Sequence, residues 1–137
     1  MGNRAVISFD ENDNATGVYL HWNGGPESVL AFLDAAKELG VRGGEDQPYF
    51  FARFCQIIGN FFGGTTSVGI GPVKSLDTDN GDNGWYILDQ STLAITGRLH
   101  KREAEEINAA KTADIRDYIA RINTAPRCRY SCLYGAD

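Results

Sequence analysis

The chain has 137 residues, of which 42% are hydrophobic and 23% charged, and its formal net charge is −5; this fits one soluble domain whose core needs no metal ion or disulfide. The acidic balance argues against a general nucleic-acid-binding protein, because neutralising phosphates requires a basic surface. Since the chain has neither a run of about 20 apolar residues nor a secretory leader, and only three cysteines, we expect a cytoplasmic protein that does not enter a membrane.

Two short apolar segments near the N-terminus predict a β-hairpin. They cover residues 5–9 and 18–22 and are joined by the polar residues 10–14. A glycine pair ends the second strand, and Pro26 is typical of the first position of a helix. Apolar residues at spacings of three and four then predict a helix that ends at Gly40. Its buried face is expected to be Val29, Phe32, Leu33 and Ala36.

A second helix is expected to begin at Pro48 after an Asp46 cap and to end at Gly63. Gly59 inside this helix predicts a close approach of another backbone, because glycine is otherwise unfavourable there. Residues 65–76 alternate weakly, and a proline among them predicts an edge or bulged strand. The apolar face of the helix is expected to be Phe51, Phe54, Cys55, Ile58, Phe61 and Phe62.

The segment 77–84 predicts a turn into a second hairpin, with strands at residues 85–88 and 93–96. The turn is rich in oxygen ligands, but it lacks the spacing of a calcium-binding loop, since Asp82 stands where glycine is required. A third helix is expected over residues 101–123. Its apolar face is expected to be Ile107, Ile115, Tyr118, Ile119 and Ile122.

This order of elements predicts an α+β fold. We expect one domain over residues 1–126, with a mainly antiparallel sheet of two hairpins and about three helices packed on it. Residues 127–137 form a C-terminal tail without periodicity. Cys128 and Cys132 lie in the tail, but the paired spacing of zinc-binding cysteines is absent. We therefore expect neither a metal ion nor a cofactor.

The stretch from Val18 to Val29 combines a strand, a glycine turn and a helix N-terminus, where free amides can bind an anion. It is similar to the pyrophosphate-binding loop of the ATP pyrophosphatase family, with Asn23 in place of that family's serine and Glu27 in place of its aspartate. A plain strand-to-helix turn explains the same residues and is the interpretation we favour. If a ligand does bind, a β-branched residue at Gly24 is expected to abolish binding and to leave the fold nearly intact. The resemblance implies a small anionic ligand, such as a nucleotide, on His21, Trp22, Asn23, Gly24, Gly25 and Ser28.

Cys55 and His21 are residue types found together in cysteine hydrolases, in which an imidazole activates a thiol. Alternation places His21 on the polar face of its strand, opposite Leu20 and Trp22. Cys55 falls within an apolar helix face, where a buried and unreactive thiol is the usual case. The sequence therefore favours a protein without catalytic residues, and a hydrolase is the less favoured alternative.

The charges are distributed unevenly along the chain. Residues 1–90 carry 12 acidic and 5 basic side chains, whereas residues 91–137 carry 6 acidic and 8 basic ones. Two acidic turns hold six carboxylates without a basic neighbour in the sequence, which predicts an acidic face for a basic partner protein; ordinary solubility charge is the plain alternative. The candidate protein-binding residues are Asp10, Glu11, Asp13, Asp77, Asp79 and Asp82, together with Tyr130 and Tyr134 of the tail.

Three segments resemble a set of small proteins from phages and mobile elements. They are YLHWNGGPESV at residues 19–29, ARFCQIIG at residues 52–59 and DNGWY at residues 82–86. The resemblance spans residues 5–90. It implies a compact accessory protein that acts by binding, including inhibition of host defence enzymes such as nuclease or CRISPR complexes.

The sequence therefore leads to three functional hypotheses. The preferred one is a non-catalytic protein-binding module, in which another protein is the partner and direct binding to nucleic acid is not expected. The second is a binder of a small anion or nucleotide at the turn from Asn23 to Ser28. The third is a cysteine hydrolase that uses Cys55 and His21. Assembly of several copies of the chain is left open.

Overall fold

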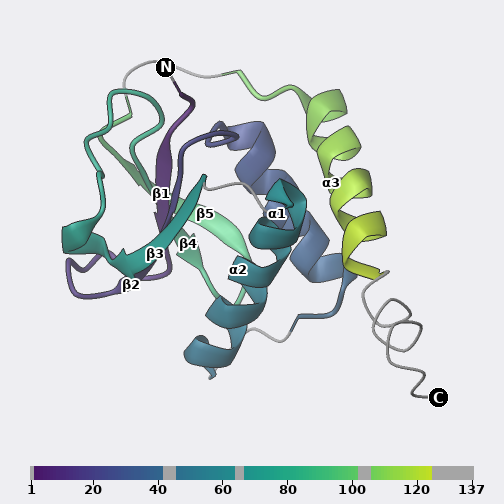
Figure 1. The fold of residues 1–137 in the computed structure, drawn as a ribbon, viewed down its shortest axis with the longest axis horizontal. Helices are drawn as coiled ribbons and strands as arrows, with labels where there is room; N and C mark the ends of the chain where they lie inside the picture. The colour runs from purple at the N-terminus through teal and green to yellow at the C-terminus, as the bar shows by residue number, and fades with distance from the viewer. Residues whose placement is uncertain (1, 42–45, 64–66, 102–105, 125–137) are drawn as a thin grey trace.

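The computed structural model describes residues 2–41, 46–63, 67–101 and 106–124, and in these residues five strands and three helices are present (Figure 1). The strands are β1 (Ala5–Ser8), β2 (Thr16–Leu20), β3 (Val68–Pro72), β4 (Trp85–Asp89) and β5 (Ala94–Leu99). The helices are α1 (Pro26–Glu38), α2 (Gln47–Phe62) and α3 (Ala109–Thr124), and one 3-10 turn, η1 (Val73–Ser75), follows β3.

The strands form one sheet in the order β3-β2-β1-β4-β5. All neighbouring strands run antiparallel except β1 and β4, which are parallel in the centre of the sheet. The predicted α+β domain with a mainly antiparallel sheet of two hairpins is confirmed. β3 is an edge strand, as Pro72 predicted, because proline cannot donate to a second neighbour.

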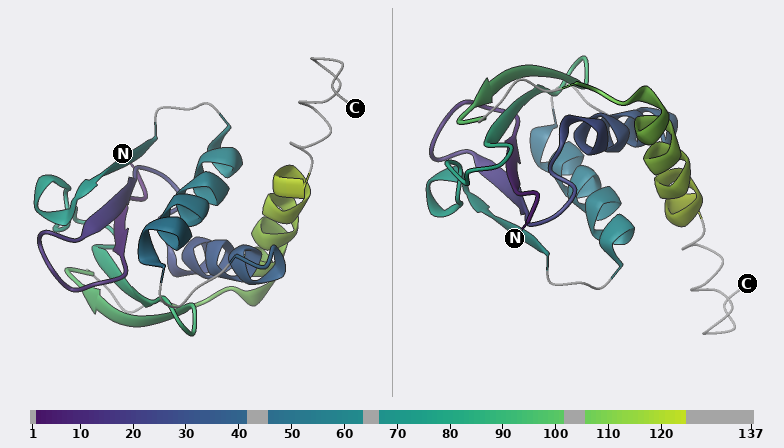
Figure 2. Two further views of the ribbon diagram at one scale, coloured as in Figure 1. Left: turned by 90° about the horizontal axis from the view of Figure 1, so that it is seen from below. Right: turned by 90° about the horizontal axis from the view of Figure 1, so that it is seen from above.

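The helices lie together on one side of the sheet (Figures 1 and 2). The core between them and the sheet includes Ile7, Leu20 and Tyr86 from the strands, with Phe32 of α1 and Phe54 of α2, all fully buried. α3 packs mainly against α1 and α2 and so forms an outer layer. The predicted face of α1 is confirmed, since all four of its apolar residues are fully buried. No helix within the described ranges is long and apolar enough to span a membrane.

A second, smaller core covers the other face of the sheet. It is formed by Val6, Val73, Trp85 and Ile87, and the Trp85 indole N–H donates to Ser8 Oγ at 2.8 Å. Tyr19 packs against this core, so the polar face of β2 is partly covered by η1 and its neighbours.

Two helix predictions need correction. Among the described residues, no heavy atom outside the helix's own backbone stands within 4 Å of the place of a Gly59 Cβ, so the expected close approach of another backbone is not found there. α3 begins at Ala109 and not at residue 101, because Asn108 caps it by accepting the Lys111 N–H at 3.1 Å. Ile107 therefore precedes the helix and is 55% exposed.

Candidate docking site

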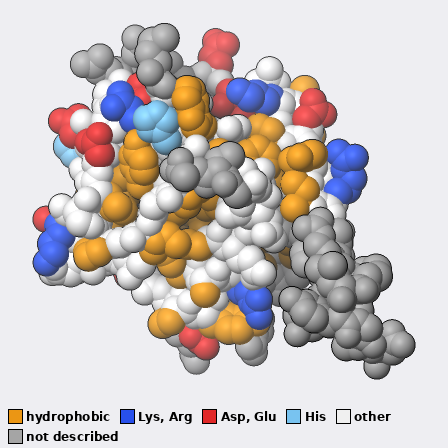
Figure 3. Space-filling view, viewed as in Figure 1, with side chains coloured by type: hydrophobic (Ala, Val, Ile, Leu, Met, Phe, Trp, Pro, Cys, Tyr) orange, Lys and Arg blue, Asp and Glu red, His pale blue; other side chains and the backbone are white. Residues whose placement is uncertain are grey.

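A pocket of about 380 Å³ opens between the first half of α2 and the edge strand β3. We call it the β3–α2 groove. In the orientation of Figure 1, hydrophobic side chains gather at the surface around these two elements (Figure 3). A concave, mainly apolar surface of this size is typical of a binding site. Its lining residues are Phe9, Asp10, Ala15, Thr16, Gln47, Pro48, Phe51, Ala52, Cys55 and Ile70.

The two walls of the groove follow from local sequence. Asp46 Oδ1 accepts the Tyr49 N–H at 3.2 Å and so fixes the first turn of α2. The spacing of four residues then places Phe51 and Cys55 on the same side of the helix. Ile70 forms the opposite wall and is 59% exposed, because it lies in a glycine-flanked edge strand. An exposed apolar side chain at the mouth of a pocket is a candidate contact for a partner.

Residues 10–14, which we call the open turn, form an acidic rim on the groove. Asp10 lines the groove, and Glu11 and Asp13 are exposed beside it. The Gln47 side-chain amide donates to Asp10 at 3.2 Å. None of the three carboxylates forms an ion pair with any residue in the described part of the chain. The groove therefore combines apolar walls with a local excess of negative charge.

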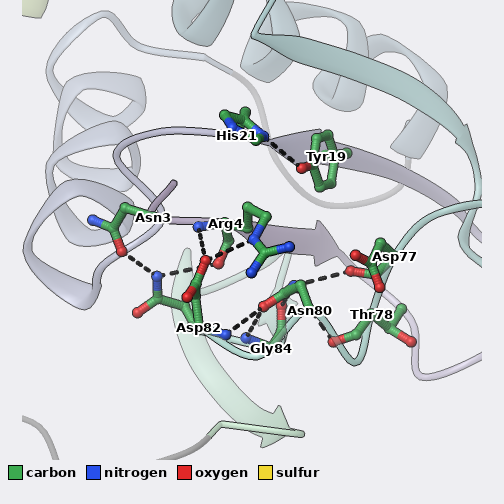
Figure 4. A network of polar contacts seen from close by, with 10 residues as sticks. Asn3, Arg4, Tyr19, His21, Asp77, Thr78, Asn80, Asp82 and Gly84 are labelled. Carbon is green, nitrogen blue, oxygen red and sulfur yellow. Dashed lines mark hydrogen bonds and ion pairs between the residues drawn. The ribbon is translucent and has the colours of Figure 1, made fainter. Parts of the chain in front are cut away.

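Residues 77–84, which we call the closed turn, are organised by one buried side chain, Asn80 (Figure 4). Its Oδ1 accepts the N–H groups of Asp82 at 3.1 Å and Gly84 at 3.0 Å. Its Nδ2 donates to the carbonyl oxygens of Gly84 at 3.1 Å and Asp77 at 2.9 Å. Because the turn is built around the Asn80 amide, its residues have a structural role.

Asp82 is bonded to Arg4, the residue just before β1. Its carboxylate accepts hydrogen bonds from Arg4 Nε at 2.7 Å and from the Arg4 backbone N–H at 3.1 Å (Figure 4). The hydrogen bond to Asp82 raises the pKa of the Arg4 guanidinium. Asp82 has no basic neighbour in the sequence, but the fold brings Arg4 to it, so its carboxylate is already engaged within the chain. Asp77 and Asp79 are exposed and remain predicted protein contacts.

The glycine turn packs tightly against the first strand. A Cβ at Gly24 would stand 2.5 Å from the Asn3 carbonyl oxygen and 2.9 Å from the Arg4 carbonyl carbon. The Gly24 N–H donates to that Asn3 oxygen at 2.8 Å, and the Gly24 carbonyl accepts the Tyr86 hydroxyl at 2.7 Å. The expectation that a β-branched residue here leaves the fold nearly intact is thus wrong, since the backbone of the first strand would have to move.

The other residues of the predicted ligand set serve local contacts. Ser28 is buried, its N–H donates to the Gly25 carbonyl at 3.1 Å, and its Oγ accepts the Asn23 side-chain amide at 3.3 Å. Asn23 has a φ of 57°, which suits the change of direction into α1. Ser28 and Asn23 thus bond within the turn, and the structure gives the anion-binding hypothesis no added support.

His21 and Trp22 lie at the end of β2. Tyr19 Oη and His21 Nδ1 share a hydrogen bond of 2.9 Å (Figure 4), and burial raises the pKa of Tyr19. Trp22 stands edge-on to the His21 ring at 5.2 Å and is 46% exposed. The placement of Trp22 on the same apolar face as Leu20 is wrong, because β2 ends at Leu20.

The Cys55 thiol lies in the wall of the groove and is half-buried. Burial raises its pKa from 9.0 to about 12, so the thiol is protonated and weakly nucleophilic at neutral pH. His21 does not line the groove. The structure therefore does not place the two proposed hydrolase residues in one pocket.

Other predicted site residues lie outside the described ranges. These are Tyr130 and Tyr134; Cys128 and Cys132, for which no metal site was expected, also lie outside them. Among the residues that are described, no group of three or more His, Cys, Asp or Glu side chains is arranged to hold a metal ion.

The residues that sequence reasoning missed are the groove walls. The sequence pattern places Phe51 and Cys55 on the apolar face of the second helix and Ile70 in an edge or bulged strand, and it does not indicate that these residues share a pocket. One signal was available: an isoleucine between two glycines in an edge strand has no neighbouring side chain on its own strand to cover it. Comparison of the chain with known protein families, with curated proteins and with solved structures finds no match, so function is inferred from the geometry of the chain itself.

Proposed function

We propose that this chain is a non-catalytic protein-binding module that holds a basic, apolar segment of a partner protein in the β3–α2 groove. The observation that carries the proposal is the apolar pocket beside the three carboxylates of the open turn, which form no ion pair within the described part of the chain. A partner segment with an apolar side chain and a Lys or Arg would fill the pocket and neutralise the rim. Such charge complementarity gives a binding site both specificity and a faster association rate.

The resemblance to phage and mobile-element proteins supports a more specific form of this proposal. The partner would be a nuclease complex of a host defence system, in the cytoplasm of the host. Enzymes that bind nucleic acid present Lys and Arg to the phosphates. An acidic protein docked on that basic surface would compete with the nucleic acid.

The test is retention of host proteins on the immobilised full-length chain. Ala52→Arg introduces a bulky cation into the groove, because Ala52 is an exposed lining residue of α2. Gln56→Arg is the matched control, since it adds the same charge one turn later on the same helix at an exposed position outside the lining.

We expect proteins bound by the wild type and by Gln56→Arg to be lost from Ala52→Arg, and to elute as salt is raised. The eluted proteins are then identified, and a nuclease or nucleic-acid-binding subunit among them is the expected result. Equal retention by all three forms would place the binding surface elsewhere and would contradict the proposal.

A second candidate function is binding of a small organic anion, but at a place other than the glycine turn. A pocket of about 510 Å³ is lined by Lys37, Arg98 and Lys101 and by apolar residues that include Leu30 and Ile95. Titration calorimetry with AMP, inorganic phosphate and octanoate tests it. Heat that is lost in Lys37→Gln and kept in Lys74→Gln would support this function, and no heat with any of the three anions would remove it.

A further inference from the structure

β3 has backbone groups on its outer side that no other part of the described chain uses. The Ser67 carbonyl accepts the His21 N–H at 2.9 Å, and the Val73 N–H donates to the Ala15 carbonyl at 2.8 Å. In an antiparallel ladder, residues alternate between bonding inward and pointing outward. The even-numbered residues between these two bonds, Val68 and Ile70, therefore point their N–H and C=O groups away from β2. No hydrogen bond to these outward groups occurs among the described residues.

The free edge ends at Pro72. Proline has no N–H to offer, and the Pro72 carbonyl already accepts the Ser75 hydroxyl at 2.8 Å. Val68 and Ile70 thus present a short edge of two N–H and two C=O groups. An antiparallel strand would satisfy each residue with one partner residue that exchanges both bonds. Such strand addition is a common way of binding an extended peptide, because main-chain bonds supply affinity and side-chain pockets supply specificity.

The β3–α2 groove lies where the side chains of an added strand would point. A partner residue paired with Ile70 projects its side chain to the same face of the sheet as Ile70. On that face Ile70 shares the groove with Phe51, Ala52 and Cys55 of α2. On the opposite face β3 carries only Gly69 and Gly71, which present no side chain to a partner. An added strand would therefore direct alternate apolar residues into the groove.

The position of the open turn decides which end of an added antiparallel strand would carry a basic residue. Pro72 pairs with Thr16, and the Asp13 carbonyl accepts the Lys74 N–H at 2.9 Å. The open turn thus lies at the Pro72 end of β3. The Lys74 ammonium donates to the Asn14 side chain at 3.1 Å, so it pairs with an amide and leaves the turn's carboxylates to a partner. An antiparallel strand would pass the open turn before it reaches Ile70.

We infer that the partner segment, whose binding rests on the proposed function, adds to β3 as an antiparallel strand. It places an apolar side chain in the groove opposite Ile70. It carries Lys or Arg about two to four residues before that apolar side chain. Because an extended strand rises about 3.4 Å per residue, this spacing brings the cation to the open turn.

Selection from a displayed library of random ten-residue peptides against the full-length chain tests this inference. The strongest binder is synthesised, and its affinity is measured by fluorescence polarisation. We expect a consensus in which Lys or Arg precedes an apolar residue, and loss of binding to Ala52→Arg but not to Gln56→Arg. N-methylation of single peptide bonds should weaken binding about tenfold at alternate positions and little at the positions between, because only alternate N–H groups bond to β3.

Two variants of Ile70 examine the same bonds from the protein side. Ile70→Pro removes the outward N–H and keeps the bonds to β2, whereas Ile70→Val keeps the N–H and most of the side chain. We expect Ile70→Pro to weaken binding at least tenfold and Ile70→Val much less. Circular dichroism confirms that each variant is folded, and the N-methyl scan gives the result even if Ile70→Pro is not.

The outcomes separate this inference from the proposed function. Peptides that lose binding to Ala52→Arg but tolerate N-methylation at every position would overturn strand addition and leave the proposed function standing. A consensus with Lys or Arg only after the apolar residue would overturn the antiparallel direction. Failure to select any peptide that distinguishes Ala52→Arg from Gln56→Arg would overturn both.

Discussion

Residues 77–84 are held by the Asn80 side chain and by the ion pair of Asp82 with Arg4. By contrast, the carboxylates of Asp10, Glu11 and Asp13 lie at the rim of an apolar groove and form no ion pair with any other described residue. Both turns are rich in Asp and Asn, and their composition alone does not separate them. Their surroundings do, since one turn has a buried amide at its centre and the other borders the groove. We therefore assign stability to the closed turn and recognition to the open turn.

This difference has a physical basis in where each polar group is satisfied. A buried backbone group without a partner costs free energy, so the bonds of Asn80 contribute to the stability of the fold. Exposed carboxylates contribute little to folding. They do create a field that attracts a basic partner, and that field is screened by salt. Substitutions in the two turns should therefore change different measured quantities.

The largest effect that we expect is on the reactivity of Cys55 in the groove beside the open turn. We assign this groove to docking and not to catalysis, so its thiol should react slowly. Because burial raises the pKa of Cys55 from 9.0 to about 12, its thiolate population at pH 8 falls about a thousandfold. In a Cys128→Ser/Cys132→Ser chain, iodoacetamide should react with native Cys55 at least about a hundredfold more slowly than with the chain unfolded in guanidinium. Mass spectrometry of timed samples measures both rates. Equal rates would mean a reactive thiol and would revive the hydrolase hypothesis.

Gly84 at the end of the closed turn should be the most sensitive position for stability. A Cβ there would overlap the Leu99 carbonyl oxygen and stand 2.6 Å from the His100 carbonyl carbon, at a φ of +70°. We expect Gly84→Ala to lower the free energy of unfolding by about 3 kcal/mol or more. Gly81→Ala is the matched control, because its φ is +79° but its nearest neighbour, the Arg4 guanidinium, is 3.7 Å away. It should lose only about 1–2 kcal/mol. Urea unfolding measures both losses. Equal losses of unfolding free energy would show that the positive φ alone sets the cost and that the close contact at Gly84 adds nothing.

Removing the central amide of the closed turn should have the next largest effect. Asn80→Ala leaves the buried Gly84 N–H without its partner, while the Gly84 carbonyl keeps its hydrogen bond from the Val6 N–H at 2.9 Å, and we expect a loss of about 2–3 kcal/mol in the free energy of unfolding. The exposed neighbour Asp79 provides the control, and Asp79→Ala should change stability by less than about 0.5 kcal/mol. If Asn80→Ala is equally harmless, the closed turn has no structural role and the contrast between the turns fails.

Charge reversal in the open turn should leave the free energy of unfolding almost unchanged and should lower the rate of association with the partner. With the partner in hand, Asp10→Lys/Asp13→Lys should slow association several-fold and reduce its salt dependence, because the long-range attraction is removed. Asp77→Lys/Asp79→Lys makes the same change of charge in the closed turn and should slow association less. Stopped-flow rates at two salt concentrations measure the effect. A larger effect from the closed turn would exchange the roles assigned to the two turns.

Much of the fold could be predicted from the sequence because its signals are local. The spacing of Phe32 and its neighbours identified the buried face of α1, and the Asp46 cap marked the start of α2. Pro72 identified an edge strand, since proline lacks the N–H that a central strand must donate. Each of these features depends on residues within a few positions of one another.

The candidate site could not be predicted in the same way. The groove joins Phe9 and Thr16 to Phe51 and Ile70, which only the folded sheet brings together. The Arg4–Asp82 pair spans 78 positions, so no local pattern distinguishes Asp82 from Asp10. Packing likewise explains Gly24, which the first strand approaches closely. Contacts between distant segments leave no periodic pattern in the sequence.

The central claim is that the groove beside the open turn holds a basic, apolar segment of a partner. Photo-crosslinking from the groove tests this claim most directly. A photoreactive benzoylphenylalanine replaces Ala52 in one full-length chain and Gln56 in another, and each chain is irradiated in a lysate of the natural host. We expect a crosslinked partner from position 52, with its attachment site mapped by mass spectrometry to an apolar residue near Lys or Arg, and little crosslinking from position 56. Equal crosslinking from both positions, or attachment to an acidic segment, would contradict the claim.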